Sequence, residues 1–214
     1  IQTLVSQFTD DLDKNLNVPV GKTTVELDSR FSTVRTRESN FGNLIADAMR
    51  HAVSAEVAII NGGGIRGNRI YEAGSTLTRR DILTELPFGN VTVLMALSGA
   101  DLWEALENAV SRVADQVGRF VQVSGMKFTY DPKQPKGGRI LDVNIDGKPL
   151  DRKRRYMLAT NDYLARGSED YVSLKQGKFI IDGLGGKPLA TQVINYISKL
   201  GTVSPKIEGR IKSK

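Results

Sequence analysis

The sequence predicts a single α+β domain within its 214 residues, carrying a helix at its N-terminal end. Some segments repeat their apolar residues at three- and four-residue steps, as helices do, whereas others are short apolar or alternating runs typical of strands. The two kinds of segment are interspersed, and no internal repeat or low-complexity linker divides them. With 40% hydrophobic residues, a chain of this length can bury a complete core.

The first sixty residues predict two helices and two strands. Leu4 to Val18 carries one apolar stripe at helical spacing. Thr23 to Leu27 alternates like a strand. Asn40 to Val53 predicts a helix whose first turn can be capped by Ser39 or Asn40. Val57 to Ile60 is an apolar run of the length expected for a short buried strand.

The rest of the chain continues this alternation and becomes richer in turns. Thr78 to Leu83 predicts a short capped helix, Val91 to Leu97 an apolar strand, and Leu102 to Val113 a helix that Ser98 and Asp101 introduce. The last third predicts strands over residues 121–123, 126–130, 140–145 and 156–160 and a closing helix over residues 189–200.

Composition narrows the classes of function that this chain can perform. It has no cysteine, which excludes disulfides and thiolate metal sites. No apolar run approaches the roughly 20 residues that a membrane-spanning helix needs. The formal net charge of +6 leaves a nucleic-acid-binding module open as an alternative.

The run Asn61-Gly62-Gly63-Gly64-Ile65-Arg66, directly after an apolar strand, is the most informative local feature. Glycine loses more conformational freedom on folding than any other residue, so three in succession predict left-handed backbone positions or a ligand close to the main chain. A tight turn from strand to loop without a ligand is the structural alternative. The spacing matches neither a P-loop nor a dinucleotide-binding loop.

Three spaced blocks resemble the C-terminal domain of the 5'-nucleotidase family, which includes UDP-sugar hydrolases and 2',3'-cyclic-nucleotide phosphodiesterases. The blocks are residues 35–49 (Arg-Thr-Arg-Glu-Ser-Asn-Phe-Gly-Asn and following), residues 58–66 with the three glycines, and residues 85–90 (Glu-Leu-Pro-Phe-Gly-Asn). The resemblance runs from about Thr24 to Ile211. It implies a mixed sheet with packed helices and an extracytoplasmic location, whether periplasmic, cell-surface or secreted.

The resemblance also implies a division of labour between two domains. Residues 1–22 correspond to a linker helix from a missing N-terminal metallophosphoesterase domain, and residues 23–214 to the substrate-binding domain. The single histidine, His51, agrees with this division, because a two-metal phosphoesterase needs several His and Asp ligands. We expect His51 to be an ordinary helix-end residue. No serine lies in a Gly-x-Ser-x-Gly elbow, which argues against a serine nucleophile. The resemblance implies no cofactor in this chain and two divalent metal ions on the missing N-terminal domain.

Phe88 and Tyr171 are the candidate aromatic residues for holding a nucleobase. In the resembled family the Pro-Phe-Gly phenylalanine, Phe88 here, is one half of a clamp around the base, and Tyr171 falls where we expect the other half. Packing of the Phe88 ring into the core or against its own loop is the structural alternative. The usual Gly-Gly-Asp-Gly before the second aromatic is replaced by Gly-Ser-Glu-Asp at residues 167–170. The resembled family also places a carboxylate a few residues later to hold the ribose hydroxyls, but residues 172–178 contain none, so Glu169 or Asp170 is the candidate substitute.

The remaining candidate site residues follow from the matched motifs. Arg35 and Arg66 match positions that reach the sugar and phosphate of the substrate, and a guanidinium suits that task because its planar fork donates two parallel hydrogen bonds. Asn61 matches a base-contacting asparagine, and Gly63 belongs to the same glycine turn. Together these residues predict a nucleoside- or nucleotide-binding domain that has no catalytic residue of its own.

Two other functions remain open at the level of the sequence. Residues 152–155 (Arg-Lys-Arg-Arg) could neutralise nucleic-acid phosphates, but they have no interleaved aromatic residues, and a solvated basic loop is the simpler interpretation. The altered loop at residues 167–170 also permits an interaction or adhesion module that has lost nucleotide binding. Binding of adenosine or its monophosphate separates these functions.

Overall fold

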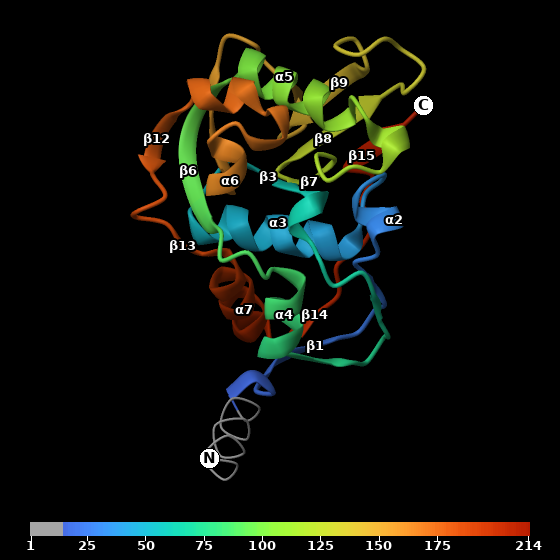
Figure 1. The fold of residues 1–214 in the computed structure, drawn as a ribbon, viewed down its shortest axis with the longest axis vertical. Helices are drawn as coiled ribbons and strands as arrows, with labels where there is room; N and C mark the ends of the chain where they lie inside the picture. The colour runs from blue at the N-terminus through green and yellow to red at the C-terminus, as the bar shows by residue number, and fades with distance from the viewer. Residues whose placement is uncertain (1–14) are drawn as a thin grey trace, which may run out of the picture.

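The computed structural model describes residues 15–214, shown as a coloured ribbon in Figure 1. Most of the helix predicted over Leu4 to Val18, and most of the linker segment 1–22, therefore lies outside the described residues. Within residues 15–214, no helix combines the length and the apolar composition that crossing a membrane requires.

A six-stranded mixed sheet forms the centre of the fold, as the resemblance predicts. Its strands follow the order β12–β6–β11–β3–β7, and β13 also pairs with β6. β3 and β11 are parallel, and the other neighbours are antiparallel. The strands are β3 (Val57–Asn61), β6 (Val91–Ser98), β7 (Val121–Ser124), β11 (Arg155–Asn161), β12 (Lys178–Ile181) and β13 (Lys187–Pro188).

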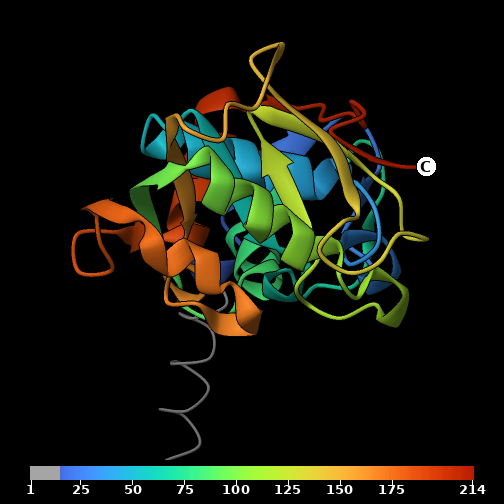
Figure 2. The ribbon, with the colours of Figure 1, turned by 90° about the horizontal axis from the view of Figure 1, so that it is seen from above.

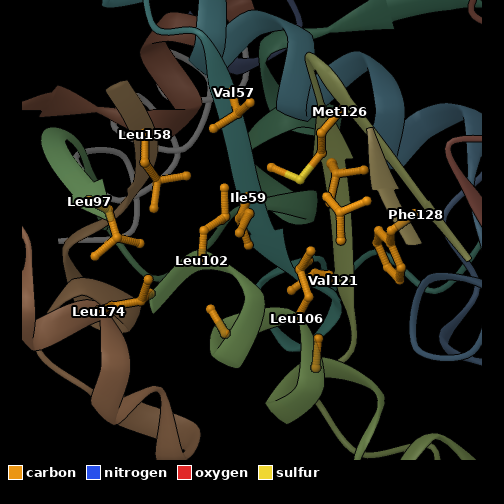
Figure 3. Packing of buried hydrophobic residues seen from close by; sticks show 14 of the residues in the cluster. Val57, Ile59, Leu97, Leu102, Leu106, Val121, Met126, Phe128, Leu158 and Leu174 are labelled. Carbon is orange, nitrogen blue, oxygen red and sulfur yellow. The ribbon is translucent and has the colours of Figure 1, made fainter. Parts of the chain in front are cut away.

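Helices cover both faces of this sheet. Figure 1 shows β3 and β7 between α5 (Gly99–Val110) and α3 (Asn40–Ala52), and from above α5 passes in front of α3 (Figure 2). Successive residues of a strand point to opposite faces, so Val57 and Ile59 pack with α5 (Figure 3), whereas Ala58 and Ile60 pack with α3. All five residues of β3 are buried, as expected for a strand covered on both faces.

Shorter elements surround these layers. Three small sheets have the orders β14–β1–β5, β10–β9–β8–β15 and β2–β4. Their strands are β1 (Pro19–Thr23), β2 (Leu27–Asp28), β4 (Ile70–Tyr71), β5 (Thr76–Thr78), β8 (Met126–Tyr130), β9 (Ile140–Ile145), β10 (Lys148–Pro149), β14 (Thr202–Val203) and β15 (Ile211–Ser213). The other helices are α2 (Phe31–Val34), α4 (Arg79–Glu85), α6 (Asp162–Ala165) and α7 (Leu189–Leu200), and the 3-10 turns are η1 (Gly62–Gly64), η2 (Val113–Asp115), η3 (Ser168–Asp170) and η4 (Val172–Gln176).

The helix starts follow the capping residues in the sequence. The Ser39 hydroxyl accepts a hydrogen bond from the Gly42 amide and caps α3, and Ser98 caps α5 in the same way, so that α5 begins at Gly99. The prediction of one strand over Thr23 to Leu27 is wrong. The Thr23 hydroxyl donates to the Val25 carbonyl and accepts from the Val25 amide, and this local turn separates β1 from β2.

One edge of the central sheet collects the loops that matter for function. β3 and β11 are parallel neighbours, so their carboxyl ends, Asn61 and Asn161, lie at the same edge. The antiparallel strands β6 and β7 begin at this edge, since Asn161 pairs with Thr92 and Asn61 with Val121. Four chain segments distant in sequence therefore meet there.

Candidate functional site

A pocket of about 480 Å³ opens at this edge of the sheet. It contains five of the six predicted site residues, which are Arg35, Asn61, Gly63, Arg66 and Phe88. The motifs alone did not assign the other lining residues, which are Gly64, Asn90, Gly118, Tyr163 and Glu169, although Glu169 was one of two candidate carboxylates. Residues near the ends of four strands, together with Arg35 at the end of α2, are thus gathered around one cavity.

The glycine turn is compact because the protein's own backbone presses against it. A Cβ on Gly62 would lie 2.2 Å from the Val34 carbonyl oxygen of α2, and one on Gly63 would lie 2.8 Å from the Gly118 Cα. The Gly63 amide donates to the Gly118 carbonyl at 2.8 Å. None of the three glycines has a positive φ, so the prediction of left-handed positions is wrong. The turn brings α2 and residue 118 to the rim of the pocket.

Two arginines form the cationic wall of the pocket. Arg35 ends α2, and Arg66 lies on the loop after η1. Within residues 15–214 neither guanidinium forms a salt bridge, and the buried Nε of Arg35 has no hydrogen-bond partner. Burial and the charge of Arg66 lower the pKa of Arg35, and Glu169 partly opposes this shift. An anion in the pocket can therefore form charge-assisted hydrogen bonds with two guanidiniums that have no carboxylate partner.

Glu85 fixes the loop that carries Arg66. Its buried carboxylate accepts hydrogen bonds from the Ser29 hydroxyl at 2.8 Å, the Tyr71 hydroxyl at 2.9 Å and the Gly67 amide at 3.0 Å. Its backbone carbonyl accepts from the Arg66 amide at 2.8 Å. Burial raises the pKa of Glu85, against the opposing effect of these hydrogen bonds. The backbone amides of the consecutive residues 66 and 67 are thus both hydrogen-bonded to Glu85.

Glu169 supplies the carboxylate of the pocket. Its Oε1 accepts a hydrogen bond from the Asn61 side-chain amide at 3.1 Å, and the Asn61 side-chain oxygen accepts from Asn161 at 3.1 Å. Asn61 is 2% exposed, and these contacts fix its orientation. Burial raises the pKa of Glu169, although Asn61 and nearby arginines lower it. The structure thus places Glu169, and not the exposed Asp170, against the pocket.

The two exposed aromatic rings of the pocket are Phe88 and Tyr163, with exposed fractions of 58% and 43%. Tyr171 does not lie in the pocket. It is 0% exposed and belongs to the core cluster under α5, and its hydroxyl donates to the Arg119 carbonyl. A ring with both faces covered cannot stack on a ligand, so the assignment of Tyr171 is wrong. The sequence motifs missed Tyr163, which reaches the pocket because it follows β11 at the edge where Asn61 ends the parallel strand β3.

His51 and the basic run at residues 152–155 lie outside the pocket and make contacts within the fold. His51 lies in the last turn of α3, 5.4 Å from the Tyr196 ring, as expected for a helix-end residue. No group of three or more His, Cys, Asp or Glu side chains able to hold a metal ion occurs in the described part of the chain. In the basic run, Arg152 lies over the Trp103 ring at 4.1 Å, and Arg154 pairs with Glu56. These surroundings favour the solvated basic loop over a nucleic-acid interface.

Comparison with known proteins identifies the family. The family model described as "5'-nucleotidase, C-terminal domain" matches residues 19–176. The chain is 36% identical over 219 residues to the trifunctional nucleotide phosphoesterase protein YfkN of Bacillus subtilis, covering 97% of this chain and 15% of that protein. It is 33% identical over 211 residues to the snake venom 5'-nucleotidase of Crotalus adamanteus, covering 90% of this chain and 36% of that protein.

A solved structure gives the same result for the fold. The 5'-nucleotidase precursor from Thermus thermophilus superposes with a TM-score of 0.89 at 32% identity, covering 99% of this chain and 42% of that one. The chain thus spans less than half the length of each of these relatives. Because the family model matches most of the chain and the fold agrees along its length, this chain belongs to the family of 5'-nucleotidase C-terminal domains.

Proposed function

We propose that this domain binds a nucleoside or nucleotide in the pocket at the edge of the central sheet. One observation carries the proposal: a single cavity is lined by two exposed aromatic rings, two arginines without salt bridges and one carboxylate. A nucleobase gains about 1–3 kcal/mol from stacking on an aromatic side chain, whichever base it is. Phe88 and Tyr163 are the rings available for this stacking.

The polar residues suit the rest of such a ligand. Arg35 and Arg66 attract the phosphate, and their planar forks can each donate two hydrogen bonds to its oxygens. The Glu169 carboxylate can accept hydrogen bonds from the ribose hydroxyls, and Asn61 holds that carboxylate in place. In this proposal Asn61 serves the site chiefly through Glu169.

The family membership supports a wider proposal about the parent protein. The domain presents the phosphate of its ligand to a dimetal centre on an N-terminal metallophosphoesterase domain, so that the parent is a hydrolase of nucleotide phosphate esters. Among the described residues no cluster of three or more His, Cys, Asp or Glu side chains could hold a metal ion, so in this proposal the metal ligands belong to the other domain. Similarity to a venom protein supports an extracytoplasmic location.

Calorimetric titration of this chain with adenosine and adenosine monophosphate, in metal-free buffer, tests the binding proposal. We expect measurable affinity for both, and a loss of about 1–3 kcal/mol of binding free energy in Phe88→Ala and in Tyr163→Ala. Phe179→Ala is a matched control, because Phe179 on β12 is also 43% exposed but lies outside the pocket. Absence of heat with either ligand contradicts the proposal and favours the interaction module.

A further inference from the structure

Phe31 contacts both arginines of the pocket, although no motif drew attention to it. It is the first residue of α2, is half-buried and does not line the cavity itself. The Cζ of Arg35 lies 4.1 Å from the centroid of the Phe31 ring, and that of Arg66 lies 5.2 Å from it. Both distances are within the range in which a guanidinium is attracted to an aromatic face.

The backbone around Phe31 is fixed with respect to both arginines. Arg35 lies four residues after Phe31, which places the two side chains on one side of the short helix α2. The Phe31 amide donates to the Asn68 side-chain oxygen at 2.9 Å, two residues after Arg66. At the other end of α2, the Val34 carbonyl presses against Gly62. The ring therefore lies between α2, which leads to Arg35, and the loop that carries Arg66, and these contacts fix the distance between the two segments.

The electrostatics of the two arginines favour a neutral attractive surface between them. Their like charges disfavour each other, and the charge of Arg66 is one cause, after burial, of the lowered pKa of Arg35. Glu169 is the carboxylate in the same pocket, but it forms no salt bridge with either guanidinium. In the absence of an anion, the shared ring is the attractive surface that both guanidiniums contact, whereas Phe88 lies near Arg66 alone, at 5.6 Å.

We propose that Phe31 is a positioning residue whose ring holds the guanidiniums of Arg35 and Arg66 together as one anion-binding pair. The consequence is specificity: the pocket prefers a phosphorylated nucleoside over the same nucleoside without phosphate. This inference rests on the proposed function and deepens it. Phe31 acts through the two arginines and touches neither base nor sugar.

The test compares two ligands on two substitutions of Phe31. Phe31→Leu keeps an apolar side chain but removes the aromatic face, whereas Phe31→Tyr keeps the face. By calorimetry, we expect Phe31→Leu to weaken binding of adenosine monophosphate by about 5- to 30-fold, with adenosine binding unchanged. We expect Phe31→Tyr to bind both ligands as the original chain does. Unchanged adenosine binding also shows that the leucine variant is folded.

A double-mutant cycle separates a positioning role from a general packing role. If Phe31 acts through Arg66, then Phe31→Leu costs distinctly less affinity for adenosine monophosphate when Arg66→Gln is already present. If Phe31→Leu weakens the binding of both ligands equally, or if the losses of affinity in the cycle are additive, the inference is overturned, and Phe31 instead maintains the shape of the pocket. A leucine variant that keeps the preference for the monophosphate overturns the inference alone, whereas an original chain that binds neither ligand overturns the proposed function as well.

Discussion

Two consecutive residues next to the pocket adopt a backbone conformation that normally favours glycine. Glu169 and Asp170 have φ values of 53° and 63°. Left-handed residues with a side chain cost roughly 1–2 kcal/mol each, so other contacts must hold them. The Asn108 side-chain amide donates to the Glu169 carbonyl at 2.9 Å, and Arg119 pairs with Asp170 at 2.8 Å. These contacts direct the Glu169 carboxylate to Asn61.

The protonation of Glu169 gives the site a predictable pH dependence. Burial raises the pKa of Glu169, so its carboxylate takes up a proton at a higher pH than an ordinary glutamate, whose pKa is about 4.3. The protonated group is a poorer acceptor for ribose hydroxyls. We therefore expect the affinity for adenosine to fall as the pH is lowered through this raised pKa. In Glu169→Gln we expect weaker binding with little pH dependence.

Calorimetry between pH 4 and pH 8 measures this effect, with 2',3'-dideoxyadenosine as the control ligand because it lacks both hydroxyls. The same raised pKa affects stability in the opposite direction: acidification favours the folded chain, because the folded chain binds this proton more strongly than the unfolded chain does. The contribution of Glu169 to stability is therefore complete below the unfolded pKa and is lost as the pH rises through the folded one. An adenosine affinity that increases on acidification contradicts the assignment of Glu169.

At the scale of the element, the glycine turn η1 shows how close backbone packing builds the site. Gly62 has no positive φ, so alanine is allowed there by its backbone conformation. A Cβ at this position nevertheless lies 2.2 Å from the Val34 carbonyl oxygen, and α2 must shift to accept it. We expect Gly62→Ala to lower the free energy of unfolding by about 2–3 kcal/mol, measured by urea denaturation.

Gly138→Ala is the matched control for this substitution. Gly138 also lacks a positive φ, but the nearest atom to an added Cβ is the Pro135 carbonyl oxygen at 3.7 Å, an ordinary contact. This variant should be as stable as the original chain or slightly more so, because alanine restricts the unfolded state. Equal stability of both variants contradicts the view that α2 is held against the glycine turn.

Elements with a clear apolar pattern or a cap could be predicted from local sequence, whereas α2, β2 and β4 could not. α3, α5 and α7 carry an apolar stripe over 12 or 13 residues, and polar caps begin α3 and α5. α2 has four residues, too few for a periodic pattern, and it is held in place by Gly62 and Asn68 from a later part of the chain. The two-residue strands β2 and β4 are likewise defined by each other.

The site shows the same division. Arg35, Asn61, Gly63, Arg66 and Phe88 could be selected as candidates because each stands in a short motif that the sequence displays directly, and the fold brings all five to one pocket. The choice between Tyr163 and Tyr171 depends on which ring faces the end of β3, and that follows from the parallel pairing of β3 with β11. The contact of Phe31 with Arg66 joins segments 35 residues apart, and no local pattern predicts it.

At the scale of the whole molecule, the C-terminal segment ties several layers together through Arg210. This side chain donates two hydrogen bonds to the Asp47 carboxylate of α3, at 2.7 and 2.9 Å, and a third to the Val123 carbonyl of β7. The Glu38 carboxylate accepts from the amides of Glu208 and Arg210. Because β15 follows directly and pairs with β8, one guanidinium connects the last strand to the helix and sheet at the centre.

Substitution of Arg210 should therefore destabilise the fold without changing the binding site. Arg210 is 7% exposed, and Arg210→Met removes the guanidinium from the Asp47 carboxylate, which within residues 15–214 keeps only the hydrogen bond from the Ser124 hydroxyl, and from the Val123 carbonyl. We expect a loss of about 2–4 kcal/mol in the free energy of unfolding, and a smaller loss in Arg210→Lys, which keeps the charge but not the planar fork. Arg112→Ala, which breaks an exposed pair with Asp115, should resemble the original chain.

Urea denaturation measures these stabilities, and adenosine titration at a temperature where each variant is folded measures binding. Neither Arg210 nor its side-chain partners line the pocket. We therefore expect Arg210→Met to keep the original affinity for adenosine, whereas Tyr163→Ala loses affinity and keeps stability. A folded Arg210 variant with weakened binding would instead mean that the C-terminal tie positions the pocket, and that stability and recognition are coupled through β3 and β7.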